Sequence, residues 1–113
     1  MVKKVGTHVL IEMYGCDYSL LDDFSFVKKV FNRIIKECEF KCIKKFFHKF
    51  NPHGVTAFAV IATSHISFHS WPEFGIGAVD IFTCDKEEKA KKAAKIFLES
   101  FKPKSYKLKI FKR

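Results

Sequence analysis

The chain contains no long apolar run and no pair of cysteines in a CxxC spacing. No apolar stretch approaches eighteen residues, and the run in MVKKVGTHVLIEMYG is too short for a signal peptide and is interrupted by Glu12. Its four cysteines are spread through an apolar-rich sequence, which predicts reduced thiols instead of a disulfide scaffold. We therefore expect a cytoplasmic protein that does not bind a membrane.

Lysine and arginine are absent from residues 50–85, although the 113-residue chain carries a net charge of +9. That segment holds Glu73, Asp80 and Asp85, whereas ten of the last 25 residues are Lys or Arg. A pocket built from residues 50–85 should therefore favour a neutral or cationic ligand over a phosphate. The basic residues near the C-terminus alternate with apolar ones at helical and strand periods, as on solvated faces, so we do not expect nucleic-acid binding.

Internal repeats, linkers and low-complexity tracts are also lacking, which predicts a single α+β domain over residues 1–113. Two amphipathic helices should cover one face of a mostly antiparallel sheet, giving a two-layer α/β sandwich. The strands are too apolar to leave the other face in water, so that face is a candidate dimer interface.

The periodicity of apolar residues predicts where these elements lie. Val27, Val30, Phe31 and Ile34 form one apolar stripe in a helix over residues 22–37. A second helix is expected to start at Asp85, paired with Glu88 in a capping box, and to end before Pro103. The expected strands are residues 8–14, 41–49, 55–63, 64–70 and 77–84, and a final strand containing Tyr106, Leu108 and Ile110.

Residues 64–84, with the sequence SHISFHSWPEFGIGAVDIFTC, hold the densest group of reactive side chains. Ser64, His69, Glu73 and Cys84 lie on two strand-like runs joined by a Trp-Pro loop. Taken singly, each has a commoner structural explanation, such as a serine at a strand start or a buried cysteine. Only their ordered combination carries a functional interpretation.

A zinc site is one alternative for histidines and cysteines in this chain. His65 and His69 could join Cys38 and Cys42, but these residues have neither the CxxC nor the HExxH spacing of common zinc ligands. We therefore expect no metal cofactor.

Four segments together resemble the pyruvoyl-dependent S-adenosylmethionine decarboxylases over nearly the whole chain. They are GTHVLIEMYGCD, HKFNPHGVTA, a Ser-His-x-x-x-His-x-Trp-Pro-Glu segment and an Asp-x-Phe-Thr-Cys segment. In that family a proenzyme cuts itself before a serine, which becomes a pyruvoyl group. The resemblance implies cleavage between Thr63 and Ser64, giving a β chain of residues 1–63 and an α chain of residues 64–113. The pyruvoyl group would form a Schiff base with the substrate amine, in place of pyridoxal phosphate and without a metal.

The resemblance also implies roles for individual side chains. Ser64 is the pyruvoyl precursor, His69 transfers protons during processing with support from Thr56, and Cys84 returns a proton to the substrate carbon. Glu73 is expected to bind the ribose hydroxyls of S-adenosylmethionine. Further candidates for contact with the substrate are Phe50, Trp71 and Glu12.

Ser64 and His69 of one chain are not expected to meet. In an extended strand, residues five apart lie about 16 Å from each other and face opposite sides. The family pairs its protomers, which implies a homodimer with Ser64 and Cys84 of one chain facing Phe50, Thr56, His69 and Glu73 of the other.

Three residues depart from the pattern of the family. Thr63 stands where the family usually has Glu, Ser70 where it has Thr, and Asp85 where it has Gly. Thr63 bears most directly on self-cleavage, because its branched side chain lies beside the bond to be cut.

The resemblance predicts decarboxylation of S-adenosylmethionine to the aminopropyl donor for polyamine (spermidine) synthesis. Two alternatives remain open at this point: a pyruvoyl-dependent arginine or ornithine decarboxylase on the same scaffold, and an unprocessed inactive homologue. Glu73 and Phe50 favour the nucleoside-bearing substrate over the plain amino acids.

Overall fold

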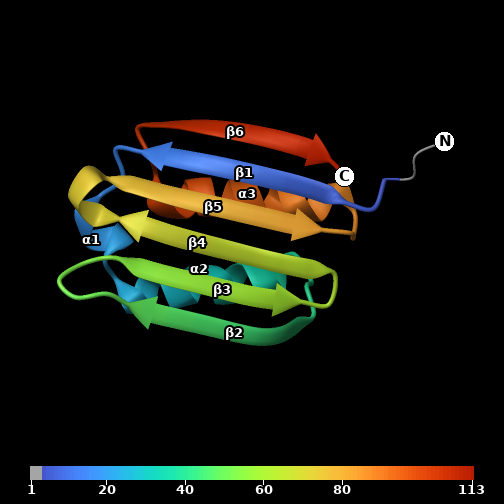
Figure 1. The fold of residues 1–113 in the computed structure, drawn as a ribbon, viewed down its shortest axis with the longest axis horizontal. Helices are drawn as coiled ribbons and strands as arrows, with labels where there is room; N and C mark the ends of the chain where they lie inside the picture. The colour runs from blue at the N-terminus through green and yellow to red at the C-terminus, as the bar shows by residue number, and fades with distance from the viewer. Residues whose placement is uncertain (1–3) are drawn as a thin grey trace.

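Six strands form one antiparallel sheet in the order β2-β3-β4-β5-β1-β6, and both long helices lie on the same face of it (Figure 1). The computed structural model describes residues 4–113. The two-layer α+β sandwich expected from the sequence is thereby confirmed. The strands are β1 (Thr7–Tyr14), β2 (Cys42–Lys49), β3 (Val55–Ile61), β4 (Ser64–Trp71), β5 (Ile76–Thr83) and β6 (Ser105–Lys112).

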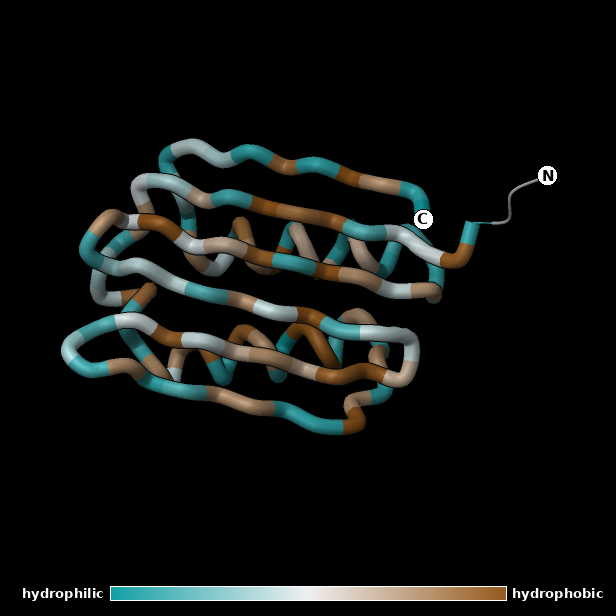
Figure 2. Tube along the Cα trace, viewed as in Figure 1, coloured by the Kyte–Doolittle hydropathy of each residue, from teal (hydrophilic) through white to brown (hydrophobic). Residues whose placement is uncertain are grey.

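The four inner strands, β1, β3, β4 and β5, alternate buried side chains with more exposed ones, as their sequences predict. On β4, Ile66 and Phe68 are fully buried beneath the helices, whereas His69 and Trp71 point to the open face. The lysine-rich β6 lies at a sheet edge, which agrees with its expected solvated position. Figure 2 shows this mixture of polar and apolar residues along every strand.

The helix expected over residues 22–37 is confirmed, and a second, short helix that the sequence did not predict comes before it. A short α1 (Tyr18–Leu21) precedes α2 (Phe24–Glu37), and the two are separated by Asp22 and Asp23. The Asp23 carboxylate accepts a hydrogen bond from the backbone N–H of Phe26 at 2.9 Å, which caps α2 and ends the continuity with α1.

The capping box expected at Asp85 is wrong. Helix α3 (Glu87–Phe101) has Lys86 as its N-cap residue, without a side-chain capping bond. The backbone N–H of Asp85 already donates to the Thr83 hydroxyl at 3.0 Å, so it is not free to pair with Glu88. The Asp85 carboxylate instead accepts hydrogen bonds from the Lys86 N–H and the Lys89 ammonium.

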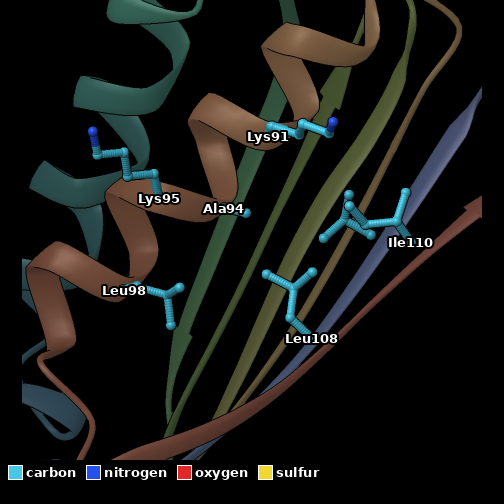
Figure 3. A pocket seen from close by; sticks show the side chains of 7 residues that line it. Lys91, Ala94, Lys95, Leu98, Leu108 and Ile110 are labelled. Carbon is cyan, nitrogen blue, oxygen red and sulfur yellow. The ribbon is translucent and has the colours of Figure 1, made fainter.

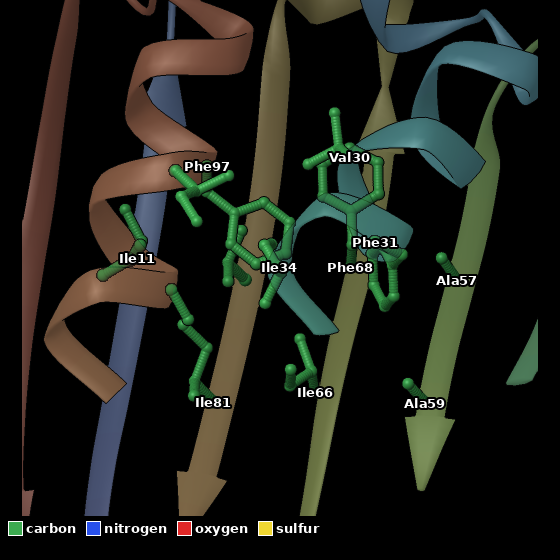
Figure 4. Close-up of a cluster of buried hydrophobic side chains, with 14 of the residues drawn as sticks. Ile11, Val30, Phe31, Ile34, Ala57, Ala59, Ile66, Phe68, Ile81 and Phe97 are labelled. Carbon is green, nitrogen blue, oxygen red and sulfur yellow. The ribbon is translucent and has the colours of Figure 1, made fainter. Parts of the chain in front are cut away.

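The core fills the space between the sheet and the two long helices (Figure 4). Phe68 of β4 stacks on Phe97 and Phe101 of α3, with ring centroids 6.1 and 4.9 Å apart. Phe31 of α2 meets Phe97 edge-on at 5.7 Å, which joins the two helices over the centre of the sheet. These aromatic contacts stabilise the sheet on which the site residues are placed.

The sheet face opposite the helices has no cover in the described part of the chain. Several large apolar side chains on it remain exposed, including Phe46 (58%), Phe58 (38%), Trp71 (44%) and Phe111 (46%). Among residues 4–113, no helix combines the length and the apolar character needed to cross a membrane.

Candidate active site

Ser64 begins β4 directly after a two-residue turn, and its backbone has an unusual conformation. Its φ angle is 146°, outside the left-handed helical region in which Glu39 and Lys102 lie at 55° and 47°. Residues with a side chain rarely adopt this conformation, which costs on the order of 1–3 kcal/mol. Backbone strain is therefore concentrated at the serine for which self-cleavage is expected.

The carbonyl oxygen of Thr63, in the bond expected to be cut, accepts two hydrogen bonds from one residue. The backbone N–H of Cys84 donates at 2.9 Å and the Cys84 thiol donates at 3.3 Å. Two donors on one carbonyl oxygen polarise it and stabilise the negative charge that nucleophilic attack would place there. Cys84 follows β5, the neighbour of β4, so the strand order brings the thiol to this position.

The Thr63 side chain is held by Thr83, a residue that the sequence analysis did not single out. The Thr83 hydroxyl donates to the Thr63 hydroxyl at 2.9 Å and accepts the N–H of Asp85 at 3.0 Å. Thr83 is fully buried and stands opposite Ser64 in the register of β4 and β5. Its position in the Asp-x-Phe-Thr-Cys segment was the only signal in the sequence that pointed to it.

Five other predicted residues line one open cleft of about 470 Å³ at the other end of the sheet. His69 pairs with Thr56 in the register of β4 and β3, and the Thr56 hydroxyl lies 3.1 Å from Nδ1 of His69. The predicted residues in the wall of this cleft are Phe50, Thr56, His69, Trp71 and Glu73, and we call it the Glu73 cleft.

The loop over residues 50–54 forms one wall of the Glu73 cleft and is fixed at both ends. The N–H of Phe50 donates to the carbonyl oxygen of Gly54 at 2.8 Å, and Gly54 adopts a φ of 113° that a side chain would disfavour. The N–H of Gly54 donates to the Asp22 carboxylate at 2.8 Å, and the Lys49 ammonium lies 3.0 Å from the same oxygen.

Glu73 lies on the short 3-10 helix η1 (Pro72–Phe74), and its carboxylate has a partner that the sequence analysis missed. Nε2 of His53 lies 3.1 Å from Oε2 of Glu73. The other ring nitrogen of His53, Nδ1, lies 3.4 Å from the hydroxyl of Tyr18. His53 was visible in the HKFNPHGVTA segment, but its spacing from Glu73 carried no signal.

Glu12 lies apart from the Glu73 cleft. It points to the open face of β1 and lines a shallow hollow of about 220 Å³ together with Ser67, His69 and Asp80. Asp80 accepts from His8 at 2.6 Å and lies 3.5 Å from His65. Glu12 therefore shares a surface with His69 but not with Glu73.

The site residues thus form two groups that one chain keeps apart. Thr63, Ser64 and Cys84 lie where β4 begins and β5 ends, whereas the Glu73 cleft lies where β4 ends and β3 begins. Figure 1 shows these two places at opposite ends of the sheet.

No predicted site residue enters the small apolar pocket on the helix side of the sheet. This pocket of about 160 Å³ lies between α3 and strands β1 and β6, and its lining includes Leu98, Leu108 and Ile110 (Figure 3). Lys91 and Lys95 also line it, and the rest of its lining is apolar. Within residues 4–113, no three side chains among His, Cys, Asp and Glu gather closely enough to hold a metal ion.

Comparisons with known proteins agree with one another. The family model described as S-adenosylmethionine decarboxylase matches residues 7–113. The S-adenosylmethionine decarboxylase proenzyme of Archaeoglobus fulgidus is 42% identical over 102 residues, which are 90% of this chain and 91% of that protein. The proenzyme of the same name from Sulfurihydrogenibium sp. is 38% identical over 113 residues, covering 100% of this chain and 85% of the relative. The crystal structure of the adenosylmethionine decarboxylase from Aquifex aeolicus VF5 has a TM-score of 0.94 at 31% identity, covering 99% of this chain and 92% of that one.

Proposed function

Because the chain belongs to the S-adenosylmethionine decarboxylase family, we propose that it decarboxylates S-adenosylmethionine with a pyruvoyl group made from its own Ser64. The product would be the aminopropyl donor for spermidine synthesis. The observation that carries this proposal is the doubly hydrogen-bonded carbonyl of Thr63 beside the strained Ser64.

Self-processing begins with the Ser64 hydroxyl. Its oxygen attacks the Thr63 carbonyl carbon, the Ser64 nitrogen leaves, and the peptide bond becomes an ester. Loss of the Ser64 α-proton then expels the Thr63 carboxylate, and water replaces the freed nitrogen, which leaves as ammonia. The products are a β chain of residues 1–63 and an α chain of residues 64–113 that begins with the pyruvoyl group.

The contacts at the turn support the first of these steps. Attack places negative charge on the Thr63 oxygen, toward which the N–H and thiol of Cys84 already point. Cleavage before Ser64 also relieves the backbone strain that its φ angle of 146° imposes. The branched Thr63 side chain is turned toward Thr83 by their hydrogen bond, which holds it in a fixed direction.

The pyruvoyl group would accept the electrons that remain when the substrate carboxylate departs as carbon dioxide. The residues around it hold and move protons and bind the substrate. Cys84 holds an exposed thiol next to residues 63 and 64, in a position to return a proton to the substrate carbon. Glu73 would accept hydrogen bonds from the ribose hydroxyls, and Phe50 and Trp71 would contact the adenine.

The proposed unit is a homodimer with two shared sites. A two-fold axis lying between two stacked sheets and across their strands brings one end of a sheet against the opposite end of its partner. Ser64 and Cys84 of one chain would then face Phe50, Thr56, His69 and Glu73 of the other. The exposed aromatic side chains on the uncovered sheet face support this packing. The four unpaired cysteines agree with a reducing, cytoplasmic location.

The first experiment is the intact mass of the purified protein under denaturing conditions. We expect two fragments that split between Thr63 and Ser64, with the second blocked to Edman degradation and trapped by a hydrazine. The Ser64→Ala variant is the matched control and should stay whole. A wild-type chain that remains whole after long incubation would overturn the pyruvoyl mechanism.

The second experiment identifies the substrate. Carboxyl-labelled S-adenosylmethionine should release labelled carbon dioxide, and labelled arginine and ornithine should not. Release from arginine or ornithine alone would keep the pyruvoyl chemistry but reject the nucleoside substrate.

A further inference from the structure

His53 lies in the wall of the Glu73 cleft, and both of its ring nitrogens face polar side chains. Nε2 lies 3.1 Å from Oε2 of Glu73, and Nδ1 lies 3.4 Å from the hydroxyl of Tyr18. The Tyr18 and His53 rings meet edge-on, with an interplanar angle of 81° and centroids 6.1 Å apart. The imidazole is therefore held on both sides.

These contacts determine which ring nitrogen of His53 carries the hydrogen. A carboxylate has no hydrogen to donate, so the 3.1 Å contact is favourable when Nε2 carries a hydrogen that faces Glu73. In neutral His53 the other nitrogen, Nδ1, is then an acceptor, which matches a donating Tyr18 hydroxyl. Tyr18 is hydrogen-bonded to His53, and His53 in turn contacts the Glu73 carboxylate.

The backbone around His53 is fixed as well, so the ring cannot easily leave Glu73. The next residue, Gly54, is bound to Asp22 through its N–H, and its carbonyl oxygen accepts the N–H of Phe50. Tyr18 is the first residue of α1, and the Asp17 carboxylate caps that helix by accepting the N–H of Ser19 at 2.8 Å. The short helix missed by the sequence analysis therefore places the hydroxyl that orients His53.

A carboxylate that binds two neighbouring hydroxyls must present both oxygens in one plane toward them. The Glu73 side chain is about one-third exposed and lies on a short 3-10 helix, so little else restricts its rotation. The contact of Nε2 of His53 with Oε2 of Glu73 at 3.1 Å restricts the plane of the carboxylate and leaves the remaining lone pairs for a ligand.

We propose that His53, oriented by Tyr18, is a positioning residue that holds Glu73 for recognition of the vicinal ribose diol of a nucleoside. The inference rests on the proposed function, which assigns Glu73 to the ribose. It goes further by assigning the diol selectivity of the cleft to a residue outside the predicted site and by giving α1 a part in it.

The test compares two nucleosides on the purified protein. The probes are 5′-methylthioadenosine, which has the diol, and its 2′,3′-dideoxy analogue, and calorimetry measures both dissociation constants. His53→Leu removes the donor and keeps an apolar body of similar size, whereas His53→Gln keeps an N–H near the position of Nε2. Tyr18→Phe removes only the hydroxyl that faces Nδ1.

We expect His53→Leu to weaken 5′-methylthioadenosine about tenfold and the dideoxy analogue less than twofold, because only the diol uses the oriented carboxylate. His53→Gln should restore most of the loss, and Tyr18→Phe should show a smaller loss with the same selectivity. In turnover of S-adenosylmethionine, His53→Leu should raise KM and leave kcat nearly unchanged.

Equal weakening of both nucleosides by His53→Leu would overturn the inference, because it would indicate a role only in the shape of the cleft. No weakening of either, or no binding of the diol probe to wild type, would overturn it as well. If His53→Leu does not fold, the two nucleosides are compared on His53→Gln and Tyr18→Phe instead. A Tyr18→Phe variant that weakens both nucleosides equally, or neither, would then overturn the inference. Failure of the proposed function is a separate result, namely no cleavage at Ser64 and no release of carbon dioxide, and nucleoside binding can still be measured on the uncut chain.

Discussion

The thiol of Cys84 lies 3.3 Å from the carbonyl oxygen of Thr63, and the Cys84 backbone N–H lies 2.9 Å from the same oxygen. The side chain proposed to protonate the substrate thus also contacts the bond proposed for self-cleavage. The two functions of Cys84 can be separated, because a substitution removes the thiol and keeps the N–H.

Cys84→Ala should slow self-cleavage by roughly tenfold without abolishing it, because a thiol is a weaker donor than an oxyanion-hole amide, whose loss costs roughly 10²–10³-fold. Decarboxylation by the cleaved fraction should fall much further, since the proton donor is lost. A time course of fragment formation by mass spectrometry measures the first effect, with Cys84→Ser as the control that keeps a donor. Cleavage at the wild-type rate would mean that the thiol contact does not contribute.

Thr83→Val should slow self-cleavage more than Thr83→Ser does. The valine has nearly the same shape as threonine but cannot donate to Thr63 or accept the N–H of Asp85, which leaves that turn less ordered. We expect a decrease of about fivefold for Thr83→Val, which corresponds to a loss of about 1 kcal/mol, and near wild-type cleavage for Thr83→Ser. Equal rates for the two variants would show that the hydroxyl is not used.

Two inactive variants should complement each other if the sites are shared between chains. The Ser64→Ala chain supplies an intact Glu73 cleft with its His69, and the His69→Ala chain supplies an intact Ser64. The mixed dimer therefore contains one complete site. Coexpression should restore roughly half of the activity of wild type per mixed dimer, whereas each variant alone is inactive. Absence of complementation, with mixed dimers present, would contradict shared sites.

A charge on the uncovered sheet face should weaken the proposed dimer. Phe58→Asp places a charge on the uncovered face of the sheet, where Phe58 stacks on His65 with centroids 5.5 Å apart. We expect the dissociation constant of the dimer to rise at least tenfold over that of wild type, as measured by analytical ultracentrifugation. Lys95→Asp, on the helix side of the molecule, should leave the dimer unchanged.

Asp22→Asn should destabilise the fold and alter its dependence on pH. Burial raises the pKa of the Asp22 carboxyl, but the Gly54 N–H, the Lys49 ammonium and His53 together hold it below its ordinary value. The unfolded chain therefore binds this proton more readily, and the stabilisation by Asp22 is complete above its unfolded pKa of about 3.9 and is lost as the pH falls through the folded value.

We expect Asp22→Asn to cost about 1–2 kcal/mol at pH 7. The difference from the parent chain should shrink below about pH 4. Urea unfolding measures both, in a Ser64→Ala background that keeps the chain whole. A difference that stays constant from pH 7 to pH 3 would rule out the charged form of Asp22 as the cause.

Iodoacetamide should react with Cys84 long before Cys16 and Cys38. Burial raises the pKa of the Cys16 thiol to about 11, so that roughly one molecule in a thousand carries the thiolate at pH 8. Burial also raises the pKa of Cys38, which is 2% exposed, whereas Cys84 is exposed. Peptide mass spectrometry after brief labelling should find Cys84 modified, Cys42 partly modified and the other two unmodified. Early labelling of Cys16 would show that its surroundings open in solution.

Much of the fold could be read from the sequence because the signals are local. The alternation in SHISFHS and the apolar stripe from Val27 to Ile34 both report burial against the same core, and both are confirmed. The capping box at Asp85 was predicted wrongly because two neighbours compete for one backbone group. The N–H of Asp85 donates to the Thr83 hydroxyl, and α3 starts after Lys86 without a side-chain cap.

The sequence by itself determined the family, the strand and helix periods, and most of the residues that form the Glu73 cleft, because short motifs and periodic patterns lie along a contiguous stretch of chain. Only the tertiary structure decided that Cys84 meets Thr63, that Thr83 holds its side chain, and that His53 reaches Glu73. These pairs are about 20 residues apart, and their contacts depend on which strands become neighbours and in which register. Strand order and register result from packing the whole core at once, so no local stretch of sequence specifies them.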